Sequence, residues 1–188
     1  MNVLIVPEDF RQDQYLLKPL FERLFEELGR PQKVMVCQNP RLRGVRQALD
    51  RERLRDIVTR YPMDDIFILC VDRDGMRNRK TRLIQIENEF TGLHTFIAEN
   101  AWEEIETWAL AGLKLRPGWT WRSVRSEVSV KETYFEPLAR HMGLADGPGG
   151  GRKEMGMIAA QSIKAIRRKC PEDFGDLANR LQKLLAVA

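Results

Sequence analysis

The sequence feature that most constrains the fold is a short apolar run, Ile66 to Val71, that ends in Asp72-Arg73-Asp74-Gly75. A continuous run of β-forming residues indicates a strand buried on both faces, as in a parallel sheet. Side chains two positions apart in an extended chain point to the same face, so Asp72 and Asp74 are expected to project together. They would do so at the carboxyl end of the strand, where open α/β sheets bind their ligands.

This acidic pair predicts a metal site. Two carboxylates held close together repel each other unless a cation lies between them, and hard divalent ions such as Mg²⁺ favour oxygen ligands. Ordinary turn chemistry is the alternative, because Asp and Gly also serve the backbone needs of a turn after a strand. A calcium-binding loop fits less well, since Met76 stands where a third acidic ligand is needed and a strand precedes the motif.

The first part of the chain alternates between strand and helix patterns. Such alternation predicts an α/β fold with a mostly parallel sheet flanked by helices. After Gly112 the pattern becomes helical and includes a glycine-rich hinge at 146–151, so we expect a core of residues 1–113 and a helical C-terminal extension, 114–188, packed on that core. The expected strands are 2–7, 33–37, 65–71 and 94–98, and the expected helices are 13–28, 45–61, 80–90, 101–113, 133–142, 153–169 and 171–185.

Charge and composition limit the class of protein. The 188 residues contain no apolar run near the length of a membrane span, no leader of the signal-peptide type and three widely spaced cysteines, which together predict a cytoplasmic protein without disulfides or membrane segments. The formal net charge is +4, and basic residues crowd the segments 41–55 and 73–82 around the acidic motif. Basic groups beside carboxylates fit a polyanionic substrate such as nucleic acid. The basic cluster at 164–169 is expected to be a solvated helix face.

Other acids are expected near the same edge of the sheet. Glu8 follows the first strand, and parallel strands would bring it beside the acidic motif that ends the third. In the expected helix 101–113, Glu106 falls on the apolar face, where a carboxylate needs either a basic partner or a metal. Glu104 lies nearly opposite. Glu99 is expected at the end of the fourth strand, as an acid that complements the dipole of the following helix.

The pattern resembles a known superfamily. A strand ending in Glu8 and a later strand ending in Asp72-Arg-Asp74 resemble the TOPRIM fold shared by topoisomerases, primases and OLD-type nucleases. Glu104-Ile-Glu106-Thr-Trp108 resembles the acidic helix motif after the fourth strand in OLD-type proteins. The segments Gly151-Arg-Lys153-Glu-Met-Gly156 and Cys170-Pro-x-x-Phe174 resemble the C-terminal part of small standalone bacterial TOPRIM-like proteins. Those proteins have no assigned function and are often encoded beside ABC-type or AAA-type ATPases.

The resemblance implies roles for individual residues. Glu104 would be a supporting metal ligand, and Lys153 would stabilise charge on the phosphate. Glu8 would serve either as a ligand or as the general base near the attacking water. The main ligands for Mg²⁺ or Mn²⁺ would be Glu8, Asp72, Asp74 and Glu106.

The sequence departs from the OLD-type pattern at two places. OLD-type sites often place an acid four residues after the first Glu, but Gln12 stands there and Asp13 comes one position late. This departure puts a second metal ion in question. A serine common in the acidic helix motif is replaced by Glu104, which changes the charge and reach of that ligand.

The expected function is that of a Mg²⁺- or Mn²⁺-dependent phosphodiesterase, a nuclease acting on DNA or RNA. The resemblance adds the role of effector in a bacterial anti-phage defence system with an ABC-type or AAA-type ATPase partner. The alternative is a non-catalytic TOPRIM-fold interaction module that regulates a partner ATPase. Topoisomerase activity is not expected, because no tyrosine-bearing cleavage domain accompanies the core, and His94 and His141 are expected to be structural.

Overall fold

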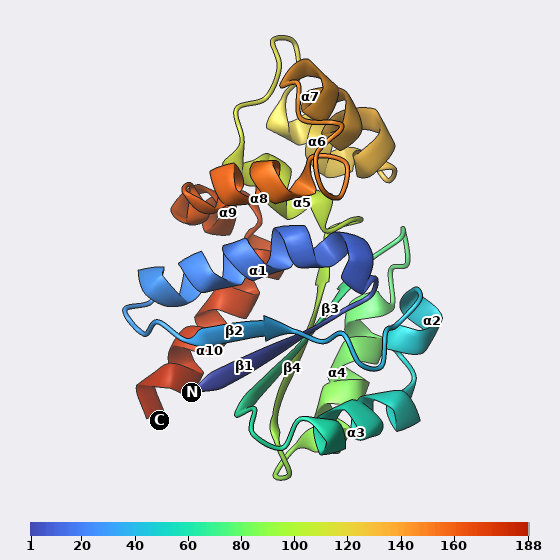
Figure 1. Ribbon diagram of the computed structural model, residues 1–188, viewed down its shortest axis with the longest axis vertical. Helices are drawn as coiled ribbons and strands as arrows, with labels where there is room; N and C mark the ends of the chain where they lie inside the picture. The colour runs from blue at the N-terminus through green and yellow to red at the C-terminus, as the bar shows by residue number, and fades with distance from the viewer. Residues whose placement is uncertain (188) are drawn as a thin grey trace.

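A parallel sheet forms the centre of the computed structural model, which describes residues 1–187 (Figure 1). Its four strands lie in the order β2-β1-β3-β4. Pro7 of β1 pairs with Cys70 of β3, so these neighbouring strands end at the same edge. The structure therefore confirms the expected α/β fold. The strands are β1 (Asn2–Pro7), β2 (Lys33–Val36), β3 (Ile66–Asp72) and β4 (Thr95–Ala101).

Both faces of the sheet are buried, which explains why its strands read as continuous apolar runs. Along β1, Val3 and Ile5 face one hydrophobic core, whereas Leu4 and Val6 face another. The first core is completed by α1 and by helices within residues 106–187, and the second by α2, α3 and α4. Four of these helices are α1 (Phe10–Glu27), α2 (Val45–Ala48), α3 (Arg51–Arg60) and α4 (Arg79–Phe90).

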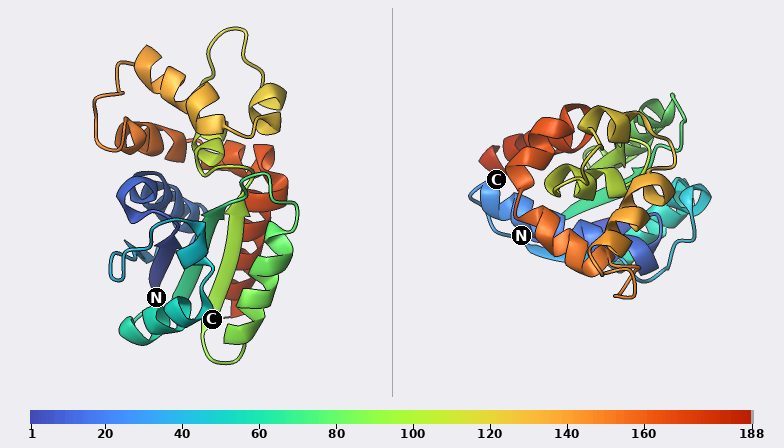
Figure 2. Two further views of the ribbon diagram at one scale, coloured as in Figure 1. Left: turned by 90° about the vertical axis from the view of Figure 1, so that its right-hand side faces the viewer. Right: turned by 90° about the horizontal axis from the view of Figure 1, so that it is seen from above.

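The helical extension begins beyond the carboxyl ends of the strands and then returns to the core (Figures 1 and 2). Trp108 of α5 meets Phe174 with ring centroids 5.2 Å apart, and Phe174 also lies 6.2 Å from Phe21 of α1. The extension therefore packs on the core, and its last helix lies on the same face of the sheet as α1. α5 (Glu106–Gly112) is the last helix of the expected core segment. The helices of the extension are α6 (Trp121–Ser126), α7 (Glu136–His141), α8 (Arg152–Ala160), α9 (Ile163–Lys169) and α10 (Asp176–Val187), with π-helical turns at Lys131–Phe135 and Pro171–Gly175.

Several expected element boundaries were wrong. The single helix expected over 153–169 is two helices, α8 and α9, which are separated by residues 161 and 162. β4 continues to Ala101 because Glu99 and Asn100 are buried within it, and the helix expected from residue 101 begins only at Glu106. The single helix expected over 45–61 is two helices. It breaks at Asp50, whose carboxylate caps α3 by accepting hydrogen bonds from the backbone N–H groups of residues 52 and 53 at 3.0 and 3.2 Å.

The glycine-rich segment 146–151 is a packed turn rather than a flexible hinge. Gly149 has a φ of 66°, and a Cβ there would lie 2.6 Å from the ring of Tyr15. Its carbonyl accepts a hydrogen bond from Nη1 of Arg152 at 2.7 Å. The turn thereby fixes the start of α8 against α1. None of the helices within residues 1–187 combines the length and apolar character that a membrane span requires.

Candidate functional site

Two predicted site residues meet at the carboxyl edge of the sheet. Glu8 directly follows β1, and Asp72 is the last residue of the neighbouring strand β3. Oε2 of Glu8 accepts a hydrogen bond from the backbone N–H of Asp72 at 3.2 Å. Oδ1 of Asp72 in turn accepts one from the backbone N–H of Ile105 at 2.8 Å, which ties the end of β3 to the segment before α5. Adjacent parallel strands thus bring both carboxylates together.

Asp13 joins these acids from the first turns of α1. Its carboxylate accepts a hydrogen bond from the backbone N–H of Asp9 at 2.8 Å. Burial, followed by the charges of Glu106, Glu8 and Asp9, raises the pKa of Asp13 to about 8 against the lowering effect of the hydrogen bond. In the sequence, Asp13 stands one position after the place where OLD-type sites often carry an acid. The signal for its inward placement was its position one turn before the buried Leu16 and Leu17.

Burial and mutual repulsion govern the electrostatics of this group. The pKa of Asp72 is raised well above its ordinary value, first by burial and then by the charges of Glu106, Glu8 and Asp13. Burial likewise raises the pKa of Glu8, although hydrogen bonds and the charge of Arg79 oppose the shift. We call Glu8, Asp13, Asp72 and Glu106 the carboxylate cluster. Each of its members lies within the electrostatic reach of another, and their combined charge favours a cation or a proton.

Glu106 has a basic partner, which was one of the two outcomes left open by the sequence. Nε of Arg152 lies 3.1 Å from its Oε1, and Nη2 of Arg152 also contacts that oxygen. The side chains of Glu106 and Arg152 are only 8% and 6% exposed. The guanidinium also lies over the ring of Phe135, 5.3 Å from its centroid. Arg152 was missed because the adjacent Lys153 carries the resemblance, and the local sequence does not show which of these two cations in the first turn of α8 faces Glu106.

Asp74 does not project from an extended strand beside Asp72, so this expectation was wrong. β3 ends at Asp72, and Asp74 adopts a left-handed conformation with a φ of 52° in the following turn. There it pairs with Arg79 at 3.3 Å, with its side chain 47% exposed. Asp74 still raises the pKa of Glu8 through its charge, so it lies near the carboxylate cluster without entering it.

Glu104 and Glu99 lie in separate surroundings. Oε2 of Glu104 accepts a hydrogen bond from the backbone N–H of Lys131 at 2.5 Å. Burial is the largest cause that raises the pKa of Glu104 to about 7, and the charge of Glu106 is another, so Glu104 borders the cluster. Glu99 lies inside β4 rather than at its end, where it pairs with Lys80. Burial raises the pKa of Glu99 to about 7 although Lys80 lowers it.

Lys153 is exposed in the first turn of α8. Its backbone N–H donates to the carbonyl of Pro148 at 3.3 Å. Because Arg152 faces inward to Glu106, the next residue on the helix faces another direction. The cation that contacts the carboxylate cluster in the structure is therefore Arg152.

A basic pocket of about 500 Å³ opens beside Glu8. Its wall includes Arg11 from the first turn of α1 and Arg41 and Arg43 from the loop after β2, all three exposed. The backbone N–H of Gly44 donates to the carbonyl of Glu8 at 3.2 Å, which holds this loop against the end of β1. The pocket can therefore present three guanidinium groups to an anion next to the carboxylate cluster.

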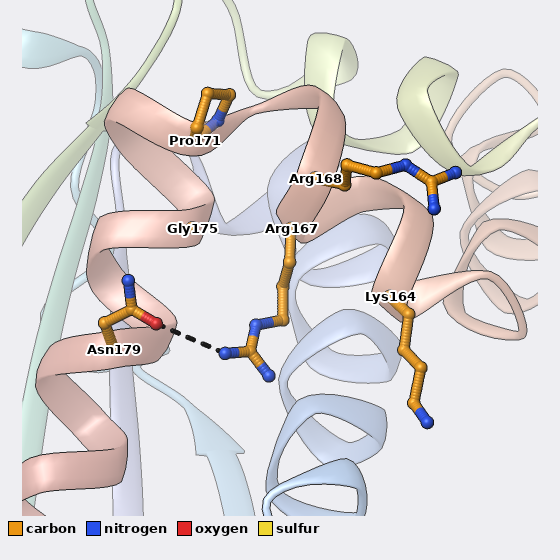
Figure 3. A pocket seen from close by; sticks show the side chains of 6 residues that line it. All are labelled: Lys164, Arg167, Arg168, Pro171, Gly175 and Asn179. Atoms are coloured by element: carbon orange, nitrogen blue, oxygen red, sulfur yellow. Dashed lines mark hydrogen bonds between the residues drawn. The ribbon is translucent and has the colours of Figure 1, made fainter.

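A second basic surface lies far from these acids. Figure 3 shows a pocket of about 320 Å³ between α9 and α10, lined by Lys164, Arg167 and Arg168 on one side and by Asn179 on the other. Arg167 donates a hydrogen bond to Asn179 at 3.2 Å. It also pairs with Glu27, at the C-terminal end of α1, at 2.6 Å. Its position at that end of α1 separates this pocket from the carboxylate cluster, which lies at the N-terminal end.

The chemistry of the carboxylate cluster fits a divalent cation, but its side chains do not form a finished metal site. Buried carboxylate oxygens that repel one another are the donors that Mg²⁺ and Mn²⁺ prefer. Within the part of the chain that the structure describes, however, no three His, Cys, Asp or Glu side chains converge closely enough to hold a metal ion. Comparison with protein-family models, curated proteins and solved structures found no match to this chain.

Proposed function

We propose that this protein is a Mg²⁺- or Mn²⁺-dependent phosphodiesterase of the TOPRIM type, a nuclease acting on DNA or RNA. The observation that carries the proposal is the meeting of Glu8 and Asp72 at the carboxyl edge of the sheet, inside a group of mutually repelling acids. Ordinary turn chemistry does not require acids from two strands and two helices to be buried together. The adjacent basic pocket adds a surface suited to phosphate groups.

The carboxylates would hold the metal. Glu8 and Asp72 would be the central ligands, with Asp13 from α1 as a further one and Asp74 and Glu104 as supporting ones. Glu106 would join only by leaving Arg152. When bound, a divalent cation would polarise the phosphodiester and lower the pKa of the attacking water.

The residues of this chain would supply the remaining chemistry. Arg11, Arg41 and Arg43 would orient the phosphate backbone in the pocket beside Glu8. The raised pKa of Glu8 makes it a better proton acceptor than an ordinary carboxylate, as a general base requires. Arg152 or Lys153 would offset charge on the phosphoryl oxygens. The exposed Lys153 could reach a substrate at the surface, whereas Arg152 is already beside Glu106.

Cleavage and metal binding can be tested on the same proteins. Purified protein is incubated with plasmid DNA, single-stranded DNA and RNA, in Mg²⁺, in Mn²⁺ and in EDTA. We expect cleavage of at least one substrate with metal only, and a loss of about 100-fold or more in Asp72→Asn. Glu52→Gln is the matched control, since Glu52 is an exposed acid in the first turn of α3.

Thermal melting gives an independent readout of the metal. Mn²⁺ should raise the melting temperature of the wild type and of Glu52→Gln, but not that of Asp72→Asn, which should be no less stable than the wild type in EDTA because it removes a repelled charge. An equal Mn²⁺ shift in all three proteins would contradict a metal site at Asp72. Strong destabilisation of Asp72→Asn in EDTA would instead indicate a structural carboxylate.

One observation favours a second candidate, a non-catalytic module that regulates a partner ATPase. The buried pair between Glu106 and Arg152 already neutralises one acid of the cluster without a metal. On this proposal the cluster would bind a structural ion or none, and an ABC-type or AAA-type ATPase would dock on the same fold. The absence of both cleavage and a Mn²⁺ shift would favour it. The role of effector in a bacterial anti-phage defence system depends on the TOPRIM resemblance alone.

A further inference from the structure

The pocket between α9 and α10, here called the α9–α10 pocket, presents side-chain donors and, among residues 1–187, no carboxylate (Figure 3). Oδ1 of Asn179 already accepts a hydrogen bond from Nη2 of Arg167 at 3.2 Å, so this amide has its Nδ2 donor left for a ligand. A wall of this composition suits an oxyanion. The residues that line it are Lys164, Arg167, Arg168, Pro171, Gly175 and Asn179.

One acid contacts this wall. Glu27 is the last residue of α1, and it pairs with Arg167 at 2.6 Å. Lys164 and Arg168 are exposed, and neither pairs with an acid within residues 1–187. The wall therefore holds three cations against one acid, which leaves an excess of positive charge on this surface.

The other acids of the neighbouring elements face a different pocket. Glu172 and Asp173 share one cation, Arg125, each at 2.9 Å. Both acids line a pocket of about 340 Å³ that adjoins the turn between β3 and α4, and Asp176 pairs at 3.2 Å with Lys80 of the same wall. The negative charge that these acids retain is thus presented to that pocket and not to the α9–α10 pocket.

A helix-dipole role explains only part of the basic cluster. Cations in the last turn of a helix complement its dipole, and Arg167 and Arg168 stand in the last turn of α9. Lys164, however, is the second residue of α9, where a cation is unfavourable. Arg168 follows it by four residues, so the two like charges lie on the same side of the helix and repel each other. A bound polyanion would offset this cost.

Figure 3 shows that the cations are spread out and do not converge on one point. Arg167 reaches toward Asn179 of α10, whereas the side chains of Lys164 and Arg168 extend away from that hydrogen bond. Separate cations along one surface fit the repeated phosphates of a nucleic-acid backbone better than they fit a single small anion.

The length of α1 sets the distance between this pocket and the carboxylate cluster. Arg167 contacts Glu27, and Asp13 of the cluster lies fourteen residues earlier on the same helix. Because an α-helix rises about 1.5 Å per residue, these two positions are about 21 Å apart. Each strand of duplex DNA places one phosphate about every 3.4 Å, so a duplex that reaches from one position to the other spans at least about six base pairs.

We infer that the α9–α10 pocket binds the phosphate backbone of the nucleic acid that the carboxylate cluster would cleave, with Lys164 and Arg168 as the main contacts. Phosphate contacts carry no sequence information, so this surface would favour long substrates over short ones without selecting a sequence. The inference rests on the proposed function for the place of cleavage, whereas binding itself can be measured without cleavage.

Binding is measured by fluorescence anisotropy in EDTA, with full-length protein and labelled DNA and RNA hairpins whose stems have about 20 base pairs, well above the expected span. The test variant is Lys164→Gln/Arg168→Gln. The control variant is Arg60→Gln/Arg140→Gln, which removes the same charge from two exposed arginines of α3 and α7. Each of these arginines pairs with an acid one turn earlier on its own helix, and such surface pairs contribute little to stability.

At about 0.1 M salt, the test variant should bind the long hairpins about tenfold more weakly than the wild type and the control variant do. For DNA, its slope of log affinity against log salt should be smaller by about 1.8, because each lost phosphate contact removes about 0.9. Its thermal melting should be unchanged, since both substitutions are at exposed positions. Equal salt slopes in the test and control variants would overturn the inference, as would a wild type that binds neither hairpin. A lower melting temperature with unchanged affinity would assign these cations to the helix dipole.

Cleavage in Mg²⁺ or Mn²⁺ tests the spacing. The test variant should lose about tenfold in kcat/KM on the long hairpins but not on hairpins with stems of about four base pairs, which are too short to reach both places. Equal losses on both lengths would contradict the spacing. Binding that depends on Lys164 and Arg168 without cleavage by any of the proteins would leave this surface standing and remove the nuclease proposal. Wild-type cleavage that the test variant retains in full on both lengths would do the reverse.

Discussion

At the scale of single residues, burial sets the chemistry of the carboxylate cluster more strongly than any one contact. It is the largest cause of the raised pKa of Glu8, Asp13 and Asp72, ahead of every neighbouring charge. The backbone hydrogen bonds that these acids accept lower their pKa values without cancelling the effect of burial. An apo protein with such acids is less stable near neutral pH than it would be with their charges removed.

Asp13 gives the clearest test of that cost. Its pKa rises from 3.8 to about 8 in the folded protein, so the folded state holds this proton more tightly than the unfolded state does. Stability from Asp13 is therefore complete at low pH and is lost as pH rises between these two values. We expect Asp13→Asn to unfold at higher urea concentration than the wild type in EDTA at pH 8. The gain in the free energy of unfolding should be about 1.4 kcal/mol for every factor of ten by which folding tightens proton binding to Asp13.

The pH dependence supplies the control for this prediction. The gain in stability of Asp13→Asn should shrink as the pH falls and vanish near pH 4, the ordinary pKa region of an aspartate. Asp146→Asn, at an exposed aspartate before the glycine-rich turn, should follow the wild-type curve at every pH. A constant difference between Asp13→Asn and the wild type across the pH range would show that the charge of Asp13 is not responsible.

Arg152 and Lys153 are adjacent residues with different surroundings. We therefore expect their substitutions to have different effects on the free energy of unfolding. Replacing Arg152 by Met leaves Glu106 buried without a partner and should lower the free energy of unfolding by about 3–5 kcal/mol in EDTA. Mn²⁺ should restore more stability to this variant than to the wild type, because the cation replaces the lost guanidinium. Lys153→Met should change stability by less than about 0.5 kcal/mol, as surface substitutions do.

Cleavage assays on the same pair separate the two roles of these residues. If Lys153 stabilises charge on the phosphate, Lys153→Met lowers turnover by about 100-fold or more while folding stays intact. Full activity in Lys153→Met would return this residue to the solvated surface. A stable Arg152→Met in EDTA would contradict the burial and pairing of Glu106.

At the scale of elements, the sequence predicted which strand ends meet but not how each turn leaves the sheet. Glu8 and Asp72 could be placed together because parallel strands share an edge, and Glu106 could be placed on a buried face by helical periodicity. The position of Asp74 could not be predicted from the sequence, because its left-handed conformation depends on the turn that follows β3. Glu103 fixes this turn from β4's side by accepting a hydrogen bond from the N–H of Gly75 at 2.6 Å. Such a contact joins residues far apart in the chain.

The contact between α1 and α8 determines where Arg152 sits, and Gly156 makes that contact close. A Cβ at Gly156 would lie 2.4 Å from the carbonyl oxygen of Tyr15. We expect Gly156→Ala to push α8 away from α1 and to lower the free energy of unfolding by about 1–3 kcal/mol in a urea titration. Ile158→Ala, at a 41% exposed position on the same helix, should cost little. Equal stability of the two variants would contradict the close packing of these helices.

At the scale of the whole molecule, the two pockets nearest the carboxylate cluster both carry arginines, one on each side of the β3 edge. The sequence predicted these surroundings from the crowding of basic residues at 41–55 and 73–82. It could not distinguish paired from free cations, because the partners of Arg73 and Lys80 come from β4 and the segment after it. The electrostatic field around the carboxylate cluster is therefore determined by which charges the fold brings together, and not by the mildly basic net charge.

The helical extension is part of the same hydrophobic core, which leads to a last prediction about residues 1–113 alone. Trp108 is fully buried, and its indole N–H donates to Asp173, which the fragment lacks. The fragment would also expose the faces of α1 and the sheet that α8 and α10 cover. The free-energy cost of exposing this much apolar surface exceeds the few kcal/mol by which a domain is stable. We expect the fragment to lack a cooperative thermal transition by circular dichroism and to be digested rapidly by trypsin. A cooperative transition in the fragment would instead identify residues 1–113 as an independent domain, with the later helices as an appendage.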